Sequence, residues 1–194
     1  MATIKEKVLI YHQTELDNLE SIIEYGLLSR ARIQTRNVSF KNVADPEIIK
    51  GRSETGLENY VPFHFHPRTL FDYRIRNDHP NDAFVFLCMY RETARKRGAL
   101  ILPAHPLSNK KPQLFSYADG FNKIKWDKME LTQQDEGYDS QVRMAECLIR
   151  DEVAIRDIAI IYVRNTIEEE IVKSLLAKKH IVHIKVYVGD KFFG

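Results

Sequence analysis

The sequence is poor in cysteine, in glycine-rich turns and in metal-binding patterns, and each absence excludes a class of protein. Its two cysteines, Cys88 and Cys147, both lie in apolar runs, which predicts buried reduced thiols rather than a disulfide framework. The eight glycines include no G-x-G-x-x-G after a strand pattern, which argues against a dinucleotide-binding βαβ unit. The seven histidines show no H-E-x-x-H pattern and no pairing with cysteine, so we expect no metal.

Long apolar runs are also missing. The opening, MATIKEKVLIYHQTELDN, holds a short apolar patch interrupted by His, Glu and Asp, so it resembles neither a signal peptide nor a membrane span. We therefore expect a cytoplasmic protein with no membrane partner. A length of 194 residues, 44% hydrophobic and 29% charged, predicts a single globular domain over residues 1–194.

The formal net charge of +2 is too small to indicate nucleic-acid binding, but the charge is unevenly distributed. Residues 91–97 read RETARKR, and residues 109–128 read NKKPQLFSYADGFNKIKWDK, where lysines alternate with aromatic residues. Cations neutralise phosphates and aromatic faces stack on bases, which is the combination that a single-stranded nucleic-acid surface needs. The alternative is a solvated segment whose aromatic side chains anchor it to the core.

Short runs of β-branched and aromatic residues outnumber helical patterns. The predicted strands are Val8 to His12, Tyr60 to Phe65, Ala83 to Tyr90, Ala99 to Leu102, Arg143 to Ile149, Ile158 to Val163 and Ile181 to Val188. The predicted helices are Glu15 to Tyr25, Pro46 to Lys50 after the cap Asp45, and Glu168 to Lys179 with Ile171, Val172, Leu175 and Leu176 on one apolar face. These elements predict an α+β domain with a mixed or antiparallel sheet and a few peripheral helices.

The stretch YHQTELDNLESIIEYGLL, residues 11–28, places a strand directly before a helix. Thr14 has the hydroxyl of an N-cap, and Gly26 suits the position after the last helical turn. The strand would then end at His12, which leaves a polar notch where amide groups at the helix start face a ligand. A histidine that is simply hydrogen-bonded in a half-buried strand is the alternative.

A glutamate interrupts the apolar strand pattern VRMAECLI. The period of two places Glu146 on the same face as Met144 and Leu148. Carboxylates are uncommon in strands and costly to bury, so Glu146 is either functional or exposed on an edge strand. The pattern alone leaves both open.

Four segments in order resemble the ADP-ribosyltransferases of the diphtheria-toxin and poly-ADP-ribose polymerase type, and more closely the DarT family of DNA ADP-ribosyltransferase toxins. The segments are His12-Gln13-Thr14 with Asn18, Leu19, Ile22 and Gly26-Leu27; Ala44 to Ile48 with Arg52; Asn59 to Phe65 with Pro67-Arg68; and Arg143 to Ile149. They span nearly the whole chain. The sequence departs from the family at His64 and His66, where Tyr or Asn is more usual.

The resemblance implies a split ADP-ribosyltransferase-like sheet and NAD+ as the ADP-ribose donor. It implies that Glu146 is the catalytic glutamate, which steadies the ribose cation as nicotinamide leaves and accepts the proton of the acceptor base. Arg52 would contact NAD+ and assist the base, with Arg36 and Arg68 as alternatives. Residues 36–59, which contain Arg52, read as a mobile lid or binding loop.

The resemblance also assigns the remaining cofactor contacts. His12 would hydrogen-bond the adenine-side ribose, while Thr14, Gly26 and Leu28 would shape the nicotinamide pocket. The acceptor would be thymine or guanine in single-stranded DNA, because an enzyme acting on a base edge must find it unpaired.

We expect the DNA to contact a surface that precedes Glu146 in the chain. The expected contacts are Lys123, Lys125, Trp126 and Arg143, next to residues 131–140, which occupy the place of the family's acceptor-reading loop. The implied partner is a macrodomain antitoxin that removes the modification. Two alternatives are an NAD+-dependent RNA 2′-phosphotransferase, which shares the fold but lacks the glutamate, and a non-catalytic single-stranded nucleic-acid-binding module.

Overall fold

The computed structural model describes residues 2–106 and 112–193, so positions 109–111 of the lysine and aromatic segment lie outside the described residues. The strands are β1 (Leu9–Glu15), β2 (Leu27–Leu28), β3 (Tyr60–His64), β4 (Phe84–Tyr90), β5 (Leu100–Leu102), β6 (Phe115–Ser116), β7 (Glu146–Arg150), β8 (Glu152–Val153), β9 (Ile160–Val163) and β10 (Lys185–Val188). The α-helices are α1 (Leu19–Tyr25), α2 (Arg30–Arg36), α3 (Pro46–Glu54), α4 (Leu70–Asp78), α5 (Arg91–Lys96), α6 (Tyr117–Lys123), α7 (Trp126–Glu130), α8 (Ser140–Arg143) and α9 (Thr166–Lys178).

Within the described residues, eight strands form one mixed sheet in the order β10-β9-β4-β1-β3-β7-β5-β6. Neighbouring strands run antiparallel, apart from β9 and β10, which run parallel. A separate short pair joins β2 to β8. The expected α+β class with a mixed sheet is therefore confirmed.

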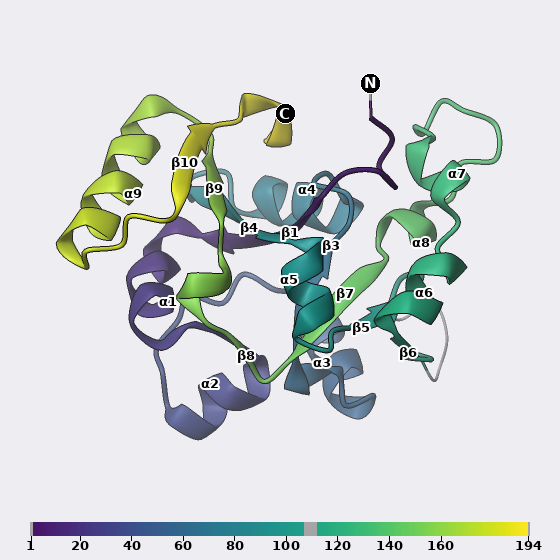
Figure 1. Ribbon diagram of the computed structural model, residues 1–194, viewed down its shortest axis with the longest axis horizontal. Coiled ribbons are helices and arrows are strands. Elements are labelled where there is room, and N and C mark those ends of the chain that lie inside the picture. Colours follow the sequence, from purple (N-terminus) through teal and green to yellow (C-terminus); the bar gives the residue numbers. More distant parts are fainter. Residues whose placement is uncertain (1, 107–111, 194) are drawn as a thin grey trace.

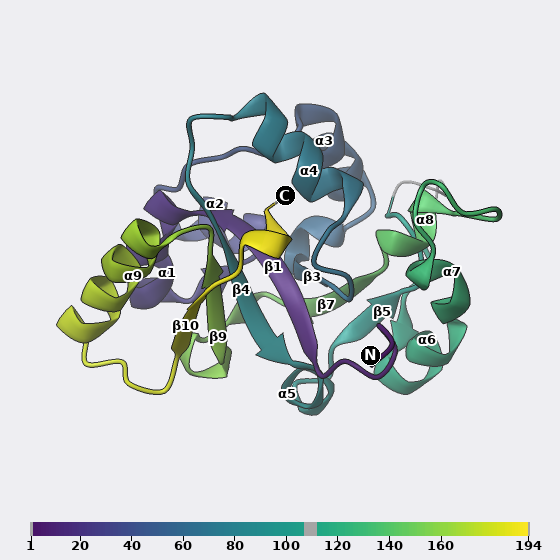
Figure 2. The ribbon, with the colours of Figure 1, turned by 90° about the horizontal axis from the view of Figure 1, so that it is seen from above.

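The helices gather in three groups around this sheet. The α1 and α9 helices lie side by side next to β9 and β10, and α6, α7 and α8 gather near the β5 and β6 end (Figure 1). The start of α3 lies near α4, because its cap Asp45 pairs with Arg74 of α4 at 3.2 Å, and both helices lie on the same side of the view from above in Figure 2. None of the helices in the described part of the chain is long and apolar enough to cross a bilayer.

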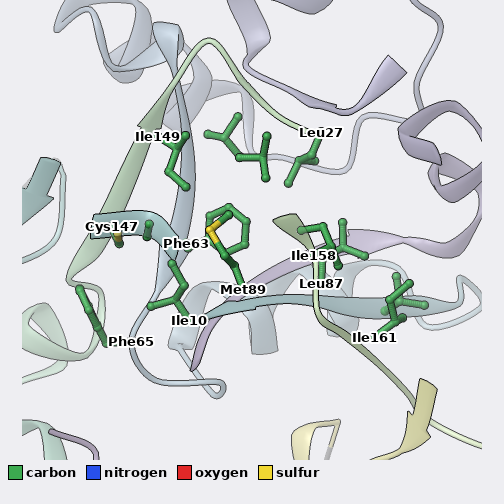
Figure 3. Close-up of a cluster of buried hydrophobic side chains, with 14 of the residues drawn as sticks. Ile10, Leu27, Phe63, Phe65, Leu87, Met89, Cys147, Ile149, Ile158 and Ile161 are labelled. Carbon is green, nitrogen blue, oxygen red and sulfur yellow. The ribbon is translucent and has the colours of Figure 1, made fainter. Parts of the chain in front are cut away.

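The main core lies on one face of the central strands. Figure 3 shows the side chain of Phe63, on β3, among those of Ile10 on β1, Met89 on β4 and Ile149 on β7. Phe63 and Met89 are fully buried. Both cysteines are buried free thiols, as expected from the apolar runs that contain them.

The sheet is weakly joined at one place, between β1 and β3. The ladder of β1 with β4 extends from Leu9 opposite Tyr90 to Glu15 opposite Phe84. Over the described residues, β1 and β3 are in register at a single pair, Tyr11 opposite His64. This seam between β1 and β3 divides the sheet into two parts, which is the split that the resemblance implied.

The first strand is longer than the sequence pattern predicted. It does not end at His12 but continues to Glu15, and Thr14 lies in the ladder opposite Val85. A 3₁₀ turn, Leu16–Asn18, then leads into α1, and the side chain before that turn makes no capping hydrogen bond. The predicted cap at Thr14 and the notch beside it are therefore wrong, because strand pairing overrides the local capping preference.

Other boundaries also shift. The predicted strand from Arg143 begins only at Glu146, since residues 140–143 form α8. The predicted strand from Ile181 is limited to β10, Lys185–Val188. Ile171 is 44% exposed, so the apolar face of α9 is narrower than expected and consists of Val172, Leu176 and the partly buried Leu175.

Candidate active site

A cavity opens beside the seam and collects the residues that the resemblance assigned to catalysis and NAD+ binding. Its lining includes His12, Thr14, Gly26, Leu28, Arg52 and Glu146. These residues come from β1, β2, α3, β7 and the turn after α1. The fold therefore brings together in one site side chains that are up to 134 positions apart, from 12 to 146, in the sequence.

Glu146 begins β7, an interior strand between β3 and β5. It lies opposite His64 on one neighbour and Leu102 on the other, and it is 3% exposed. Leu148, two residues on, is fully buried on the same face. The alternative of a glutamate facing water on an edge strand is therefore excluded.

Arg52 supplies the positive partner of this carboxylate. Its Nη1 lies 2.8 Å from Oε1 and 3.0 Å from Oε2 of Glu146, and its Nη2 donates a long 3.5 Å hydrogen bond to the carbonyl of Leu57. A buried carboxylate without such a partner would be strongly destabilising. The pair therefore holds the carboxyl group in one place at the inner wall of the cavity.

Arg52 lies on a helix and not in a loop. It is in the last turn of α3, whose start is capped by Asp45, which accepts a 2.8 Å hydrogen bond from the amide of Glu47. Of the three candidate arginines, Arg36 is exposed and pairs with Glu152 at 2.9 Å, and Arg68 is exposed and outside the cavity lining. The predicted helix from Pro46 to Lys50 is confirmed and continues to Glu54, so the expectation of a loop around Arg52 is wrong for residues 51–54.

His12 bridges the seam. Its Nδ1–H donates a 2.7 Å hydrogen bond to the carbonyl oxygen of Pro62 on β3, and its ring packs 5.6 Å from the Phe63 ring. Burial lowers the pKa of His12 to about 4, and the nearby His64 and Arg52 act in the same direction. The imidazole is therefore neutral near pH 7, with Nε2 left as a hydrogen-bond acceptor.

Pro62 explains why the two strands separate here. The carbonyl of Pro62 points towards β1, and in a strand the amide of the same residue points to the same side. Proline has no amide hydrogen, so it cannot extend the ladder to β1 at this position. The side chain of His12 donates a hydrogen bond to the Pro62 carbonyl, which the ladder leaves unpaired.

Asn18 fixes the wall of the cavity at the other end of β1. Its amide group donates to Thr14 Oγ1 at 3.3 Å and to the Lys41 carbonyl at 3.0 Å, and its Oδ1 accepts from the Lys41 amide at 2.7 Å. Lys41 in turn contacts Glu15 and pairs with Asp82 at 3.0 Å. Thr14 thus lines the cavity from within β1, and Asn18 connects it to the backbone of Lys41.

Gly26 lets the chain turn back towards the cavity. Its φ of 84° is unfavourable for other residues, and a Cβ there would lie 3.0 Å from the Val153 carbonyl. The following strand, β2, places Leu28 opposite Glu152 of β8. Both residues line the cavity, and their contact with nicotinamide stays a prediction.

The sequence did not single out three further residues of the cavity as site residues. These are Arg30, His64 and His105. His64 is buried, and its Nδ1–H donates to the Ala145 carbonyl at 3.4 Å, while burial lowers the pKa of His105. Arg30 follows Ser29, which caps α2 by accepting a hydrogen bond from the Arg32 amide at 3.3 Å, and the sequence around it gave little indication of a site.

The expected DNA-contact residues lie outside the lining of this cavity. Lys123 and Lys125 are exposed, but Trp126 is 9% exposed and its indole N–H donates to the Phe121 carbonyl at 2.9 Å. The Trp126 ring packs 5.4 Å from Phe65. Trp126 is therefore largely buried by contacts within the protein, and its contact with DNA stays a prediction.

The aromatic residues of this segment surround a buried cation, Arg91. Its guanidinium donates to the carbonyls of Leu9, Lys5 and Ile4 at 2.8 to 3.1 Å, and it lies 5.5 Å from the Trp126 ring. These contacts tie the chain before β1 to the α6 and α7 region. For Phe121 and Trp126, the structure agrees with the alternative in which the aromatic side chains anchor the segment to the core.

Arg143 and the acidic residues near it have local structural partners. Arg143 is half-buried, donates to the Leu131 carbonyl at 2.5 Å and lies 5.7 Å from the Tyr138 ring. Asp135 accepts from the amide and the hydroxyl of Thr132, both at 2.7 Å. Asp139 caps α8, since it accepts from the Gln141 amide at 3.0 Å.

A mixed sheet divided at the seam, with a buried glutamate on an interior strand, agrees with the split ADP-ribosyltransferase-like sheet that the resemblance implied. Residues 11–194 match the family model described as ssDNA thymidine ADP-ribosyltransferase, DarT. The chain belongs to this family. The expected membership of the DarT family is thereby confirmed.

Similar proteins agree with this placement. The structure of Thermus sp. 2.9 DarT in complex with ADP-ribosylated ssDNA has a TM-score of 0.84 and 20% identity, and it covers 100% of this chain and 99% of the Thermus chain. The same protein in complex with NAD+ has a TM-score of 0.78 and 19% identity, over 97% and 98% of the two chains. At these identities the likeness shows the fold.

A longer relative comes from Thermosipho africanus (strain H17ap60334). It is a DNA ADP-ribosyl transferase–DNA ADP-ribosyl glycohydrolase fusion protein, 26% identical over 95% of this chain. The chain spans about half of that relative, 49% of its length.

Proposed function

We propose that this protein transfers ADP-ribose from NAD+ to a thymidine base of single-stranded DNA and releases nicotinamide. The observation that carries the proposal is the Arg52–Glu146 pair, buried in the same cavity that the neutral His12 enters from across the seam. The family match supplies thymidine as the acceptor in preference to guanine. The Thermus relatives, solved with NAD+ and with ADP-ribosylated ssDNA, support the donor and the acceptor class.

The reaction exchanges one bond at the anomeric carbon of the nicotinamide ribose for another. The bond to the nicotinamide nitrogen breaks, and the electron pair leaves with nicotinamide. A bond then forms to a thymine ring nitrogen, which loses its proton. The Glu146 carboxylate would hydrogen-bond the ribose 2′-hydroxyl and stabilise the positive charge that develops on the sugar.

Arg52 and Glu146 would divide the remaining work. As the thymine nitrogen loses its proton to the Glu146 carboxylate, negative charge develops on the base. Arg52, 2.8 Å from Glu146, is close enough to stabilise that charge. His12, with Nδ1 held by Pro62, would use Nε2 to accept a hydroxyl of the adenine-side ribose. Thr14, Gly26 and Leu28 would border the nicotinamide.

A second hollow beside the cavity offers a route for the acceptor. It shares His105, Met144 and Phe71 with the cavity, and it is also lined by Ser140 and Gln141 at the start of α8. Ser140 is the last residue of the expected acceptor-reading loop, residues 131–140, and Gln141 directly follows it. We propose that the base reaches Glu146 through this hollow, with Lys123, Lys125 and Arg143 attracting the DNA backbone.

The test is incubation with isotope-labelled NAD+ and a panel of single-stranded oligonucleotides that contain or lack thymidine. We expect nicotinamide release and an ADP-ribosyl adduct on the thymidine of single strands, located by mass spectrometry, with little product on duplexes. A parallel arm with 2′-phosphorylated RNA examines the RNA 2′-phosphotransferase alternative. Absence of nicotinamide release with every oligonucleotide would contradict the proposal and favour the non-catalytic module.

The proposal extends to a partner and a location. Because the Thermosipho relative joins a transferase to a glycohydrolase, we propose that a macrodomain glycohydrolase removes the modification made by this chain, as in a toxin–antitoxin pair. A single catalytic domain over residues 1–194, acting in the cytoplasm on cellular DNA, fits the buried free thiols.

A further inference from the structure

The cavity is lined by three side chains that carry a positive charge at neutral pH. They are Arg30, Lys41 and Arg52. Arg52 is paired with Glu146 at 2.8 Å, and Lys41 contacts Glu15 and pairs with Asp82 at 3.0 Å. Among the described residues, Arg30 has no carboxylate within salt-bridge distance. One of the three cations therefore enters the cavity without an anionic partner.

The backbone of Arg30 is held firmly at the start of α2. Ser29, directly before it, caps the helix and donates its own amide to the Asp151 carbonyl at 2.7 Å. The Arg30 side chain donates from Nη2 to Asn42 Oδ1 at 2.9 Å and lies 5.4 Å from the Phe40 ring. A guanidinium has five N–H donors, and this arrangement uses one of them. Within the part of the chain that the structure describes, the other four make no hydrogen bond and can meet a ligand.

The electrostatic surroundings favour an anion at this place. Burial lowers the pKa of Arg30, and the neighbouring Arg52 acts in the same direction, whereas Glu58 acts against it. Arginine nevertheless stays charged in proteins, so the cavity contains a partly desolvated cation next to another cation. A bound anion would relieve both the desolvation and the repulsion.

We infer that Arg30 binds the diphosphate of NAD+, an assignment that rests on the proposed function. The diphosphate is the anionic part of the donor, and a planar guanidinium can contact phosphate oxygens with two parallel N–H groups. The uncharged contacts with Asn42 and Phe40 keep the side chain extended without competing for its charge. Arg30 is thus a binding residue for the donor and takes no part in bond breaking.

The inference is tested by measuring ligand affinity without DNA. Calorimetry compares NAD+ and ADP-ribose, which carry the diphosphate, with adenosine, which lacks it. The variants are Arg30→Ala, Arg30→Lys and, as a matched control on the same helix, Arg36→Ala. Arg36 is exposed, pairs with Glu152 and does not line the cavity.

We expect Arg30→Ala to weaken NAD+ and ADP-ribose about 10- to 100-fold, as for a charge-assisted hydrogen bond, and to leave adenosine binding unchanged. Arg30→Lys should recover part of the loss, because it keeps the charge but not the planar fork. In the transfer assay, KM for NAD+ should rise while kcat stays near the wild-type value. The increase of KM with salt should be shallower in Arg30→Ala, since one screened charge is gone.

Three outcomes would overturn the inference. Equal NAD+ affinity in folded Arg30→Ala and wild type would remove the role of Arg30 but leave the proposed function intact. Equal weakening of adenosine and ADP-ribose would show that Arg30 only supports the cavity wall. Wild-type protein that binds neither NAD+ nor ADP-ribose would contradict the proposed function itself, and this inference with it.

Discussion

Two regions of this molecule looked equally promising as binding sites, and they differ in where their side chains point. In the cavity at the seam, polar side chains that are far apart in the sequence converge, with Glu146 and Arg52 in contact. In the lysine and aromatic segment, the lysines face outwards while Trp126 and Phe121 pack around the buried Arg91. Residues of a suitable type can therefore form a binding site only where the fold directs their side chains into the same space.

The difference has a physical cause. Aromatic rings offer a large apolar area, so a short helix next to a sheet buries them before it offers them to a ligand. Gly120 of α6 shows how close that packing is, because a Cβ there would lie 2.3 Å from the Cβ of Ile101 on β5. A carboxylate is buried at a cost, so its presence inside the cavity indicates a use.

The largest effect should follow from changing the carboxylate of the cavity. Glu146→Gln keeps the shape but removes the charge, so the transfer rate should fall by about 10²- to 10³-fold with NAD+ affinity little changed. The measurement is single-turnover transfer to a thymidine oligonucleotide. Glu169→Gln, on α9 and paired with Lys173 at 3.1 Å, is the matched control. Near-normal transfer by Glu146→Gln would show that the cavity is not the catalytic centre.

Removal of the arginine should affect both function and stability. Arg52→Ala leaves Glu146 buried without a partner, so the free energy of unfolding should fall by about 3 kcal/mol, and NAD+ affinity and turnover should both decrease. Urea denaturation of Arg52→Ala, Glu146→Gln and the double variant measures the coupling, and the second change should restore part of the loss. If calorimetry finds unchanged NAD+ affinity, another arginine contacts the donor.

The neutral histidine at the seam makes stability depend on pH. Because the pKa of His12 is lowered to about 4 from an ordinary 6.5, the unfolded chain binds more protons between these values. Stability should be full above pH 6.5 and fall as the pH decreases towards 4, by up to about 1.4 kcal/mol per pH unit for each such histidine. His66, whose pKa burial lowers to about 3, adds to the same trend.

Denaturation at several pH values separates the contribution of His12. We expect His12→Asn to flatten the decrease between pH 6.5 and 4, whereas His180→Asn should leave it as in the wild type. His180 is exposed and has a φ of 56°, a conformation that asparagine adopts readily. An unchanged slope in His12→Asn would mean that the seam histidine titrates normally.

The smallest effect should come from the exposed lysines. Lys125→Ala should weaken single-stranded DNA binding by about two- to five-fold at low salt and reduce its salt dependence, because one phosphate contact is lost. Trp126→Phe should leave DNA affinity unchanged, since the indole is buried and bonded to Phe121. Fluorescence anisotropy measures both. A loss in Trp126→Phe that exceeds the loss in Lys125→Ala would return the aromatic segment to the role of a stacking surface.

The sequence predicted the strands well where β-branched and aromatic residues run together, as at Phe84–Tyr90, and it placed Glu146 and His12 correctly in the fold. It missed six short helices within the described residues, because helices of four to nine residues show little apolar periodicity. The run RETARKR was noted only for its positive charge, yet its first residue, Arg91, is buried and donates hydrogen bonds to backbone carbonyls. Such an outcome depends on which carbonyls the fold leaves unpaired, and sequence spacing does not contain that information.

The site residues show the same limit. Thr14 has a hydroxyl at the position expected of a helix N-cap. It lies in a strand instead, because β4 provides pairing partners for β1 as far as Glu15. Arg30 carried almost no signal, since an arginine after a serine is common. The sequence therefore identifies candidate site residues from their side-chain chemistry, but strand pairing between distant segments decides which of them reach the cavity.

Pro62 has a structural consequence for the whole sheet. Proline is normally found on strands at the rim, yet β3 is flanked on both sides. The interior of this sheet therefore contains two strand edges that are almost unpaired with each other, and the cavity opens beside them. A residue with an amide hydrogen at position 62 could extend the ladder between β1 and β3, so this one proline helps to keep the seam open.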